Sequence, residues 1–322
     1  MNLRWRLNYS LVKAAVWLLR LSGWYQGYWN HWRYAFAYAE QKGIHILPVH
    51  YYSPIPDTRQ LPKQLWAHLR VPLGFDLRVD PALAWLKQLN QRYGQEYNTF
   101  PKETADLHQY HLNNSAFPSG DAETLFAILR DLKPRKIIEI GSGYSTLLTC
   151  QVIRANRNDA STYRCEFTVI EPFLPAFINP PPSEVTRVEN RPVQHVPMDL
   201  FSALEAGDVL IIDSSHAAKI GSDVIHEYLS IMPNLAPGVV VHIHDIYIPA
   251  EYPRRWIDEA RFFWNEQYIV EAFLNYNREF EVIMPLHAVW QSYPQAFCEM
   301  IPSFEPERHA PSSFWIRRRL PD

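Results

Sequence analysis

The stretch Lys136–Thr149 (KIIEIGSGYSTLLT) constrains the fold of this chain more than any other part of it. It begins with an apolar run that contains the acid Glu139, and a turn with two glycines, Gly141 and Gly143, follows. From Ser145 onward the residues take up a helical pattern. A buried strand, a glycine turn and a helix in this order predict the ligand-binding corner of a doubly wound α/β fold.

Strands and helices alternate around this corner, which is typical of a mostly parallel sheet covered by helices. We predict strands at Lys136–Ile140, Phe167–Ile170, Val185–Glu189, Val209–Ile212, Val239–His244, Phe280–Met284 and Phe314–Arg317. We predict helices at Pro81–Tyr93, Asp121–Leu132, Ser145–Ala155, Met198–Leu204, Ser222–Met232 and Pro253–Tyr276. Asp121 and Ser222 are placed to cap two of these helices. The expected fold class is α/β, with a Rossmann-like, doubly wound, mostly parallel sheet of seven strands and a helical N-terminal extension.

Three segments of the 322-residue chain differ in character. Residues 1–48 are helical in pattern and rich in aromatic side chains, residues 49–116 form a cap region, and residues 117–322 hold the main domain. Lys13 and Arg20 share a helix face, which suits an amphipathic helix that rests on a membrane surface. The pattern also suits a helix packed on the main domain or on a second subunit of a homodimer. An aromatic stripe at helical spacing more often indicates such packing than membrane binding.

The overall charge and the apolar runs exclude several classes of protein. The net charge of −3 gives no basic excess, so we expect no nucleic-acid partner. The apolar run Leu11–Leu21 contains two basic residues, and its uninterrupted part is shorter than a signal-peptide core of about 7–15 residues. The sparse cysteines fit reduced thiols without zinc spacing: Cys150, Cys165 and Cys298. We therefore expect a cytoplasmic protein, peripheral to a membrane if its first helix binds lipid.

The glycine turn differs from a dinucleotide site in two respects. The third glycine of the GxGxxG fingerprint is replaced by Thr146. Glu139 beside the turn would repel a pyrophosphate but would attract a positive amino or sulfonium group. These features favour S-adenosyl-L-methionine over NAD as the cofactor. Glu171 ends the second strand, where an acid accepts hydrogen bonds from ribose hydroxyls.

Acids and histidines gather after the fourth and fifth strands, in the sequences DVLIIDSSH and GVVVHIHDIYIP. Ligands bind at this edge of open α/β sheets. The cluster consists of Asp213, His216, His242, His244 and Asp245. Two mechanisms are open. In the first, His244, His242 or Asp245 is a general base for an acceptor hydroxyl. In the second, Asp213, His244 and Asp245 hold a divalent metal that polarises this hydroxyl.

The sequence allows two possible roles for each of two further segments. His108–Asn114 (HQYHLNN) is dense in hydrogen-bonding groups, so it either wets a substrate pocket or forms a plain turn, which is the commoner role. Trp264–Tyr268 either walls the acceptor pocket or packs on the sheet.

The motifs EIGSGYST, IEPF, GDVLIIDSSH and PGVVVHIHDI together resemble those of class I S-adenosylmethionine-dependent methyltransferases. Their combination is similar to a bacterial subgroup of the small-molecule O-methyltransferase-like set, from about Tyr51 to Ser313–Arg318. The resemblance and the motifs assign cofactor contacts to Glu139, Gly141, Ser142, Gly143, Tyr144, Ser145, Glu171 and Asp213. Catalytic roles fall to His244, Asp245, His216 and His242. Metal-dependent catechol-type relatives have Asp, Asp and Asn where this chain has Asp213, His244 and Asp245, so the histidine favours a base over a magnesium site.

The expected activity is methylation of a hydroxyl on a small molecule or glycan. A non-catalytic binding or scaffold protein, and an NAD or nucleotide-sugar enzyme on the same fold, are the alternatives.

Overall fold

The structure is a computed structural model that describes residues 3–21 and 32–321. The chain divides into two compact units, Met1–Lys63 and Gln64–Asp322. This division reflects only how densely the residues pack against one another. The predicted domain boundaries therefore stay a prediction.

The described residues of the first unit form the helices α1 (Leu3–Leu21) and α2 (Trp32–Gln41), as the N-terminal pattern predicted. Residues 22–31 of the predicted helical segment lie outside the described residues. No helix in the described ranges is both long enough and apolar enough to cross a bilayer. The binding of α1 to a membrane surface or to a second copy of the chain stays a prediction.

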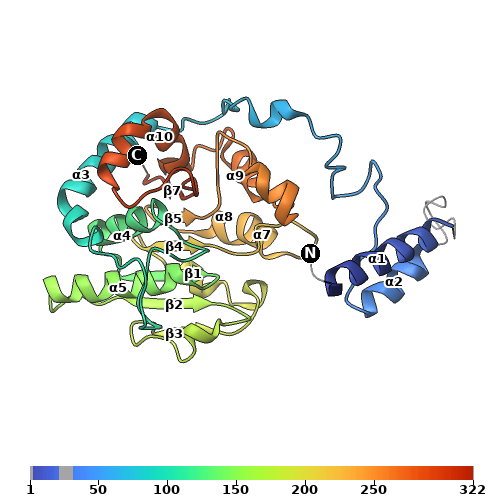
Figure 1. Ribbon diagram of the computed structural model, residues 1–322. Coiled ribbons are helices and arrows are strands. Elements are labelled where there is room, and N and C mark those ends of the chain that lie inside the picture. The colour runs from blue at the N-terminus through green and yellow to red at the C-terminus, as the bar shows by residue number, and fades with distance from the viewer. Residues whose placement is uncertain (1–2, 22–31, 322) are drawn as a thin grey trace. The chain divides into compact units, whose positions relative to one another are not determined.

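The second unit is built on a seven-stranded sheet with the strand order β3-β2-β1-β4-β5-β7-β6 (Figure 1). The strands are β1 (Lys136–Ile140), β2 (Glu166–Ile170), β3 (Arg187–Glu189), β4 (Val209–Ile212), β5 (Val240–Ile243), β6 (Phe280–Pro285) and β7 (Phe314–Arg318). The first five strands pair in parallel, and β7 runs antiparallel to both β5 and β6. The predicted α/β, Rossmann-like, mostly parallel sheet is confirmed.

Helices flank this sheet. They are α3 (Val79–Tyr97), α4 (Asp121–Leu132), α5 (Tyr144–Asp159), α6 (Asp199–Ser202), α7 (Asp223–His226), α8 (Met232–Asn234), α9 (Glu266–Leu274), α10 (Leu286–Ser292) and α11 (Pro294–Met300). Short helical turns are η1 (Lys63–Trp66), η2 (Ala176–Ile178), η3 (Val193–His195), η4 (Glu227–Ile231) and η5 (Trp256–Ala260). The sequence pattern did not predict α10 and α11.

Two apolar cores lie on the two faces of the sheet, because successive side chains of a strand point to opposite faces. Ile137 and Ile211 belong to the core that includes residues of α3, α4 and α5. Their neighbours Ile138 and Ile212 belong to the core that includes residues of α7 and α9. Figure 1 shows α4 and α5 on one side of the strands and α7 and α8 on the other. Burial on both faces explains why these strands are nearly continuous apolar runs.

The prediction of one continuous helix over Pro253–Tyr276 is wrong. The short turn η5 ends at Ala260, the next residue Arg261 adopts a left-handed backbone with φ 59°, and α9 begins only at Glu266. The backbone between η5 and α9 bonds to the loop after β4 and not within a helix, because the N–H of Asn265 donates to the carbonyl of His216 at 3.0 Å. The break brings the ring of Trp264 to 4.5 Å from the ring of His216. Tertiary contacts with the loop after β4 therefore override the helical pattern.

The predicted cap of α4 by Asp121 is also wrong. Gly120 is the N-cap residue, and its N–H donates to the side chain of Glu123 at 2.6 Å. Asp121 is the first helical residue, and its buried carboxylate accepts the N–H groups of Ser312 at 2.9 Å and Ser313 at 2.7 Å. The donors come from the loop before β7, far away in the sequence.

The predicted cap at Ser222 is confirmed. Its hydroxyl oxygen accepts the N–H of Ile225 at 3.3 Å at the start of α7.

Candidate active site

A cavity of about 400 Å³ lies at the carboxyl ends of β1, β2 and β4. Gly141, Glu171 and Asp213, which follow these three strands, line it. The strand order reverses between β1 and β4, which is the place where doubly wound sheets bind ligands. Its volume falls in the range of about 300–1,000 Å³ that small-molecule ligands occupy.

The two glycines of the turn after β1 have different roles. Gly141 has φ 93°, and a Cβ there would lie 1.9 Å from the carbonyl oxygen of Asp213. A glycine is therefore needed for the turn to pack against the end of β4. A Cβ on Gly143 would meet no protein atom within 4 Å. The open space at Gly143 leaves room for a ligand to approach the backbone.

Glu139 holds the first turn of α5 against β1. Its buried carboxyl group accepts the hydroxyls of Ser145 at 2.5 Å and Thr146 at 2.7 Å. Burial raises the pKa of Glu139 to about 8, although the two hydroxyls act in the opposite direction. The residues predicted to contact a cofactor that do not line the cavity are Glu139, Ser142, Gly143, Tyr144 and Ser145. Their contact with a cofactor stays a prediction.

Glu171 presents a carboxylate to the cavity at the end of β2, as the sequence predicted for a ribose anchor. The N–H of Phe173 donates to this carboxylate at 2.8 Å, and the hydroxyl of Ser142 donates to it at 3.4 Å. These contacts fix the carboxylate beside the glycine turn.

Gln194 lines the same cavity and was not predicted. Its amide nitrogen donates to the carbonyl of Gly221 at 2.8 Å, which fixes the side chain. Its amide oxygen is buried and has no hydrogen-bond partner among the described residues. An unpaired buried acceptor costs about 1–3 kcal/mol, so a ligand with an N–H group, such as the exocyclic amine of adenine, would satisfy it. Nothing in the local sequence marks this glutamine.

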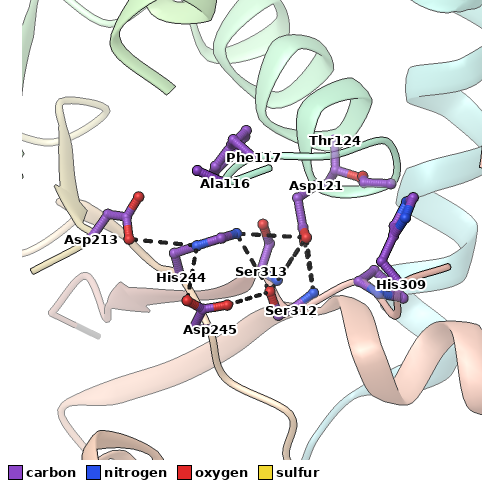
Figure 2. Close-up of polar contacts among 12 residues, drawn as sticks. Ala116, Phe117, Asp121, Thr124, Asp213, His244, Asp245, His309, Ser312 and Ser313 are labelled. Carbon is purple, nitrogen blue, oxygen red and sulfur yellow. Dashed lines mark hydrogen bonds and ion pairs between the residues drawn. The ribbon is translucent and has the colours of Figure 1, made fainter. Parts of the chain in front are cut away.

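A row of polar side chains begins at Asp213 and crosses the end of β5 (Figure 2). His244 lies at its centre, with Nδ1 3.5 Å from a carboxylate oxygen of Asp213 and Nε2 3.6 Å from one of Asp121. A carboxylate oxygen of Asp245 lies 3.7 Å from Nδ1. The hydroxyl of Ser312 is 3.4 Å from Nε2. The sequence pattern predicted Asp213, His244 and Asp245 here but not Asp121 or Ser312.

The carboxylates keep His244 protonated. Burial alone would lower the pKa of His244, but Asp245, Asp213 and Asp121 outweigh it and hold the pKa well above its ordinary value. Burial also opposes ionisation of Asp213, yet His244 and His216 keep its pKa far below the usual range. Asp245 differs, because burial raises its pKa despite the two histidines. The raised pKa favours the cationic form of His244, and its predicted role as a general base stays a prediction.

His216 is the second histidine of the site. Its Nε2 lies 3.4 Å from Asp213 and 3.5 Å from Asp245, and its Nδ1 lies 2.8 Å from the buried carboxylate of Glu266. Burial alone would lower the pKa of His216, but its bonds to Asp213 and Glu266 raise it well above the ordinary value. Both His216 and Asp245 have a left-handed backbone with φ 56°. Such strained positions cluster at functional sites.

Asp213, His216 and Asp245 each bring one ligand atom within 4.8 Å of the others. Oxygen and nitrogen donors of this kind suit a divalent metal. The bond from Glu266 to Nδ1 would leave Nε2 of His216 free for the metal, an arrangement that orients many metal-ligating histidines. The candidate metal ligands in the structure thus include His216, whereas the sequence prediction included His244.

His242 lies on the same face of β5 as His244, as its alternation predicted, but deeper in the protein. It is fully buried, its Nε2 lies 2.9 Å from the hydroxyl of Ser313, and its ring lies 4.5 Å from that of Trp315. Burial lowers its pKa to about 3, so this histidine is neutral. Its predicted catalytic role stays a prediction.

Comparisons with known proteins agree with this geometry. Residues 138–246 match the model of a family described as a methyltransferase domain. A protein from Archaeoglobus fulgidus, described as an uncharacterized protein, is 30% identical over 169 residues, which cover 49% of this chain and 73% of the relative. A solved structure titled as a Mg-SAM form of cmcI has 11% identity and a TM-score of 0.35, over 87% of this chain and 100% of its own.

The seven-stranded sheet and the cavity at the end of β1 define a Rossmann-like domain with a place for a small ligand. Residues 138–246 match a methyltransferase-domain family, and the chain belongs to the same family as the archaeal protein.

Proposed function

We propose that this protein is a class I methyltransferase that transfers a methyl group from S-adenosyl-L-methionine to a hydroxyl of a small molecule or glycan. The observation that carries the proposal is the position of Asp213. It lines the cavity after β1 and also faces both His216 and His244. One residue therefore joins the cofactor cavity to a row of acid–base groups.

The cavity and the glycine turn beside it offer a complementary group for each part of the cofactor. Glu171 would accept the ribose hydroxyls, the unpaired oxygen of Gln194 would accept the adenine amine, and the open space at Gly143 would admit the methionine part. Asp213 would then lie on the side of the reacting sulfonium, where a carboxylate stabilises positive charge.

The proposed reaction is an in-line displacement. The acceptor hydroxyl gives its proton to the carboxylate of Asp245, whose raised pKa makes it a stronger base than an ordinary aspartate. S-adenosyl-L-methionine would supply the methyl group: the acceptor oxygen would bond to the methyl carbon as the carbon–sulfur bond breaks, and the electron pair would go to sulfur. The imidazolium of His244 lies beside Asp213 and Asp245 and stabilises the negative charge that develops on oxygen.

A metal-assisted variant is the second candidate, because Asp213, His216 and Asp245 gather within 4.8 Å. A divalent metal held there would polarise the acceptor oxygen and favour loss of its proton. Electron paramagnetic resonance with Mn²⁺ separates the two mechanisms. Binding by the wild type that disappears in Asp213→Asn supports the metal. No binding, together with activity that persists in EDTA, supports the metal-free reaction.

The proposed function is tested by binding and by transfer. Calorimetry should show binding of S-adenosylhomocysteine and none of NAD or UDP-glucose. Incubation with a cell extract and methyl-labelled cofactor should place alkali-stable label in a non-protein fraction, as expected for methyl ethers. Binding of NAD or UDP-glucose instead of S-adenosylhomocysteine would reject the proposal in favour of another enzyme of this fold. Binding without transfer would favour a scaffold protein.

A further inference from the structure

A second cavity, of about 380 Å³, lies near the start of α4. Pro118 and Ser119, which directly precede α4, line it together with His309 from the loop before β7. The Nε2 atom of His309 lies 3.0 Å from the carbonyl of Ser119, which ties the loop to the start of the helix.

This second cavity and the cofactor cavity lie at opposite ends of the polar row. In Figure 2, Asp213 and His309 are at the two ends, with His244 and Asp121 between them. Asp213 lines the cofactor cavity, whereas His309 lines the second one. A methyltransferase needs its acceptor on the side of the reacting groups away from the cofactor, so the second cavity is a candidate for holding a part of the acceptor that is distant from its reacting hydroxyl.

The charge of the second cavity is positive. Lys102, Arg255 and Arg308 line it together with one acid, Glu305. Arg308 is paired with Glu305 at 3.2 Å. Lys102 and Arg255 make no ion pair with a carboxylate within the part of the chain that the structure describes. This positive lining contrasts with the net charge of −3 of the whole chain.

Neutral hydrogen-bonding side chains complete the lining, among them Asn113, Asn114 and Ser115. The segment His108–Asn114 thus contributes to a pocket, one of the two roles that its composition allowed. Ammonium and guanidinium groups form their strongest hydrogen bonds with carboxylates, phosphates and sulfates. An anion is the ligand that matches this combination of donors.

We propose that the second cavity binds an anionic group of the acceptor, so that the enzyme methylates hydroxyls of acidic small molecules or acidic glycans. This inference rests on the proposed methyltransferase function. Lys102 and Arg255 are specificity residues in it, because these two exposed cations at the cavity attract an anionic acceptor more strongly than a neutral one.

The test is binding of two small anions, inorganic phosphate and malonate, to the full chain in the presence of S-adenosylhomocysteine. The variants are Arg255→Gln and Lys102→Gln. The control is Arg254→Gln, because Arg254 is bonded to Asp258 at 2.9 Å and does not line the cavity. We expect at least one anion to bind the wild type, and each of the first two variants to weaken it about tenfold or more. Arg254→Gln should stay within about twofold of the wild type.

The anion that binds with the higher affinity shows whether the cavity prefers a phosphate-like group or a carboxylate. Absence of binding of both anions to the wild type, or equal losses in the variants and the control, would overturn the inference. The affinity for S-adenosylhomocysteine is measured in the same samples. If that affinity is normal while the anions do not bind, the acidic acceptor is rejected and the methyltransferase assignment stands. If the cofactor product does not bind at all, the proposed function itself fails.

Discussion

A carboxylate oxygen of Asp121 lies 3.6 Å from Nε2 of His244, and both side chains are buried. The same carboxylate accepts the N–H groups that precede β7. Burial alone would raise the pKa of Asp121, but His244 and these donors outweigh it, and the pKa lies below its ordinary value. The start of α4, the end of β5 and the start of β7 are thus held together by one buried ionic contact.

Asp121→Asn should lower the free energy of unfolding by about 3 kcal/mol, because it leaves the buried charge of His244 with one carboxylate fewer. Urea unfolding monitored by circular dichroism measures this change. Asp258→Asn is the control, since Asp258 pairs with Arg254 at the surface and such pairs contribute little. Equal losses in the two variants would show that the buried contact has no special role.

The turn after β1 allows two glycine substitutions with opposite expected outcomes. Gly141→Ala should destabilise the fold, because the added Cβ would overlap the carbonyl of Asp213. Gly143→Val should leave the unfolding curve nearly unchanged, since no protein atom lies within 4 Å of its Cβ position, and should weaken S-adenosylhomocysteine about tenfold or more. Calorimetry and thermal unfolding on both proteins distinguish the effects. Unchanged affinity in folded Gly143→Val would show that the ligand does not approach this turn.

Glu171→Gln should weaken S-adenosylhomocysteine by about 1.5–3 kcal/mol, the usual contribution of hydrogen bonds to a charged group. Its matched control is Glu166→Gln, at the exposed opposite end of β2. Titration calorimetry should find the control indistinguishable from the wild type. If both variants bind like the wild type, Glu171 is not the ribose anchor.

Asp245→Asn should slow methyl transfer by a factor of about 10²–10⁴, which is the usual contribution of a general base. Its affinity for S-adenosylhomocysteine should change little, because Asp245 does not line the cofactor cavity. The rate is followed as label transfer to the acceptor fraction of a cell extract. The exposed Asp199→Asn is the control, and a wild-type rate in Asp245→Asn would remove this residue from the mechanism.

Glu139 should make the stability of the ligand-free protein depend on pH. Burial raises its pKa in the folded state to about 8 from an ordinary value of 4.5. Between these values the folded protein keeps a proton that the unfolded chain has lost. The free energy of unfolding from this group therefore falls as pH rises through the window, by at most about 1.4 kcal/mol per pH unit.

Urea midpoints measured across this window check the prediction. Glu139→Gln keeps a group that can accept a hydroxyl of Ser145 or Thr146 but cannot ionise, so its stability should fall less steeply with pH than that of the wild type. Parallel pH profiles for the two proteins would contradict the assignment.

The sequence alone determined the sheet and the place of its ligand site. Apolar runs such as Lys136–Ile140 and Val209–Ile212 are short, continuous and bounded by turns, so their bounds follow from local pattern. The glycine turn and the acid Glu171 follow two of these strands, and the carboxyl ends of parallel strands share one edge. These features depend on residues that are neighbours in the chain, and they needed no knowledge of tertiary packing.

The tertiary structure decided which groups face one another and in which charge state. The local sequence predicts Asp121 as a helix cap. In the structure its carboxylate instead accepts an N–H from the loop before β7 and is a buried partner of His244. His216 became the candidate metal ligand because Glu266, at the start of the broken helix, holds its other nitrogen. Burial and charges from distant elements set these pKa values, and they act through space between residues whose separation along the chain carries no periodic signal.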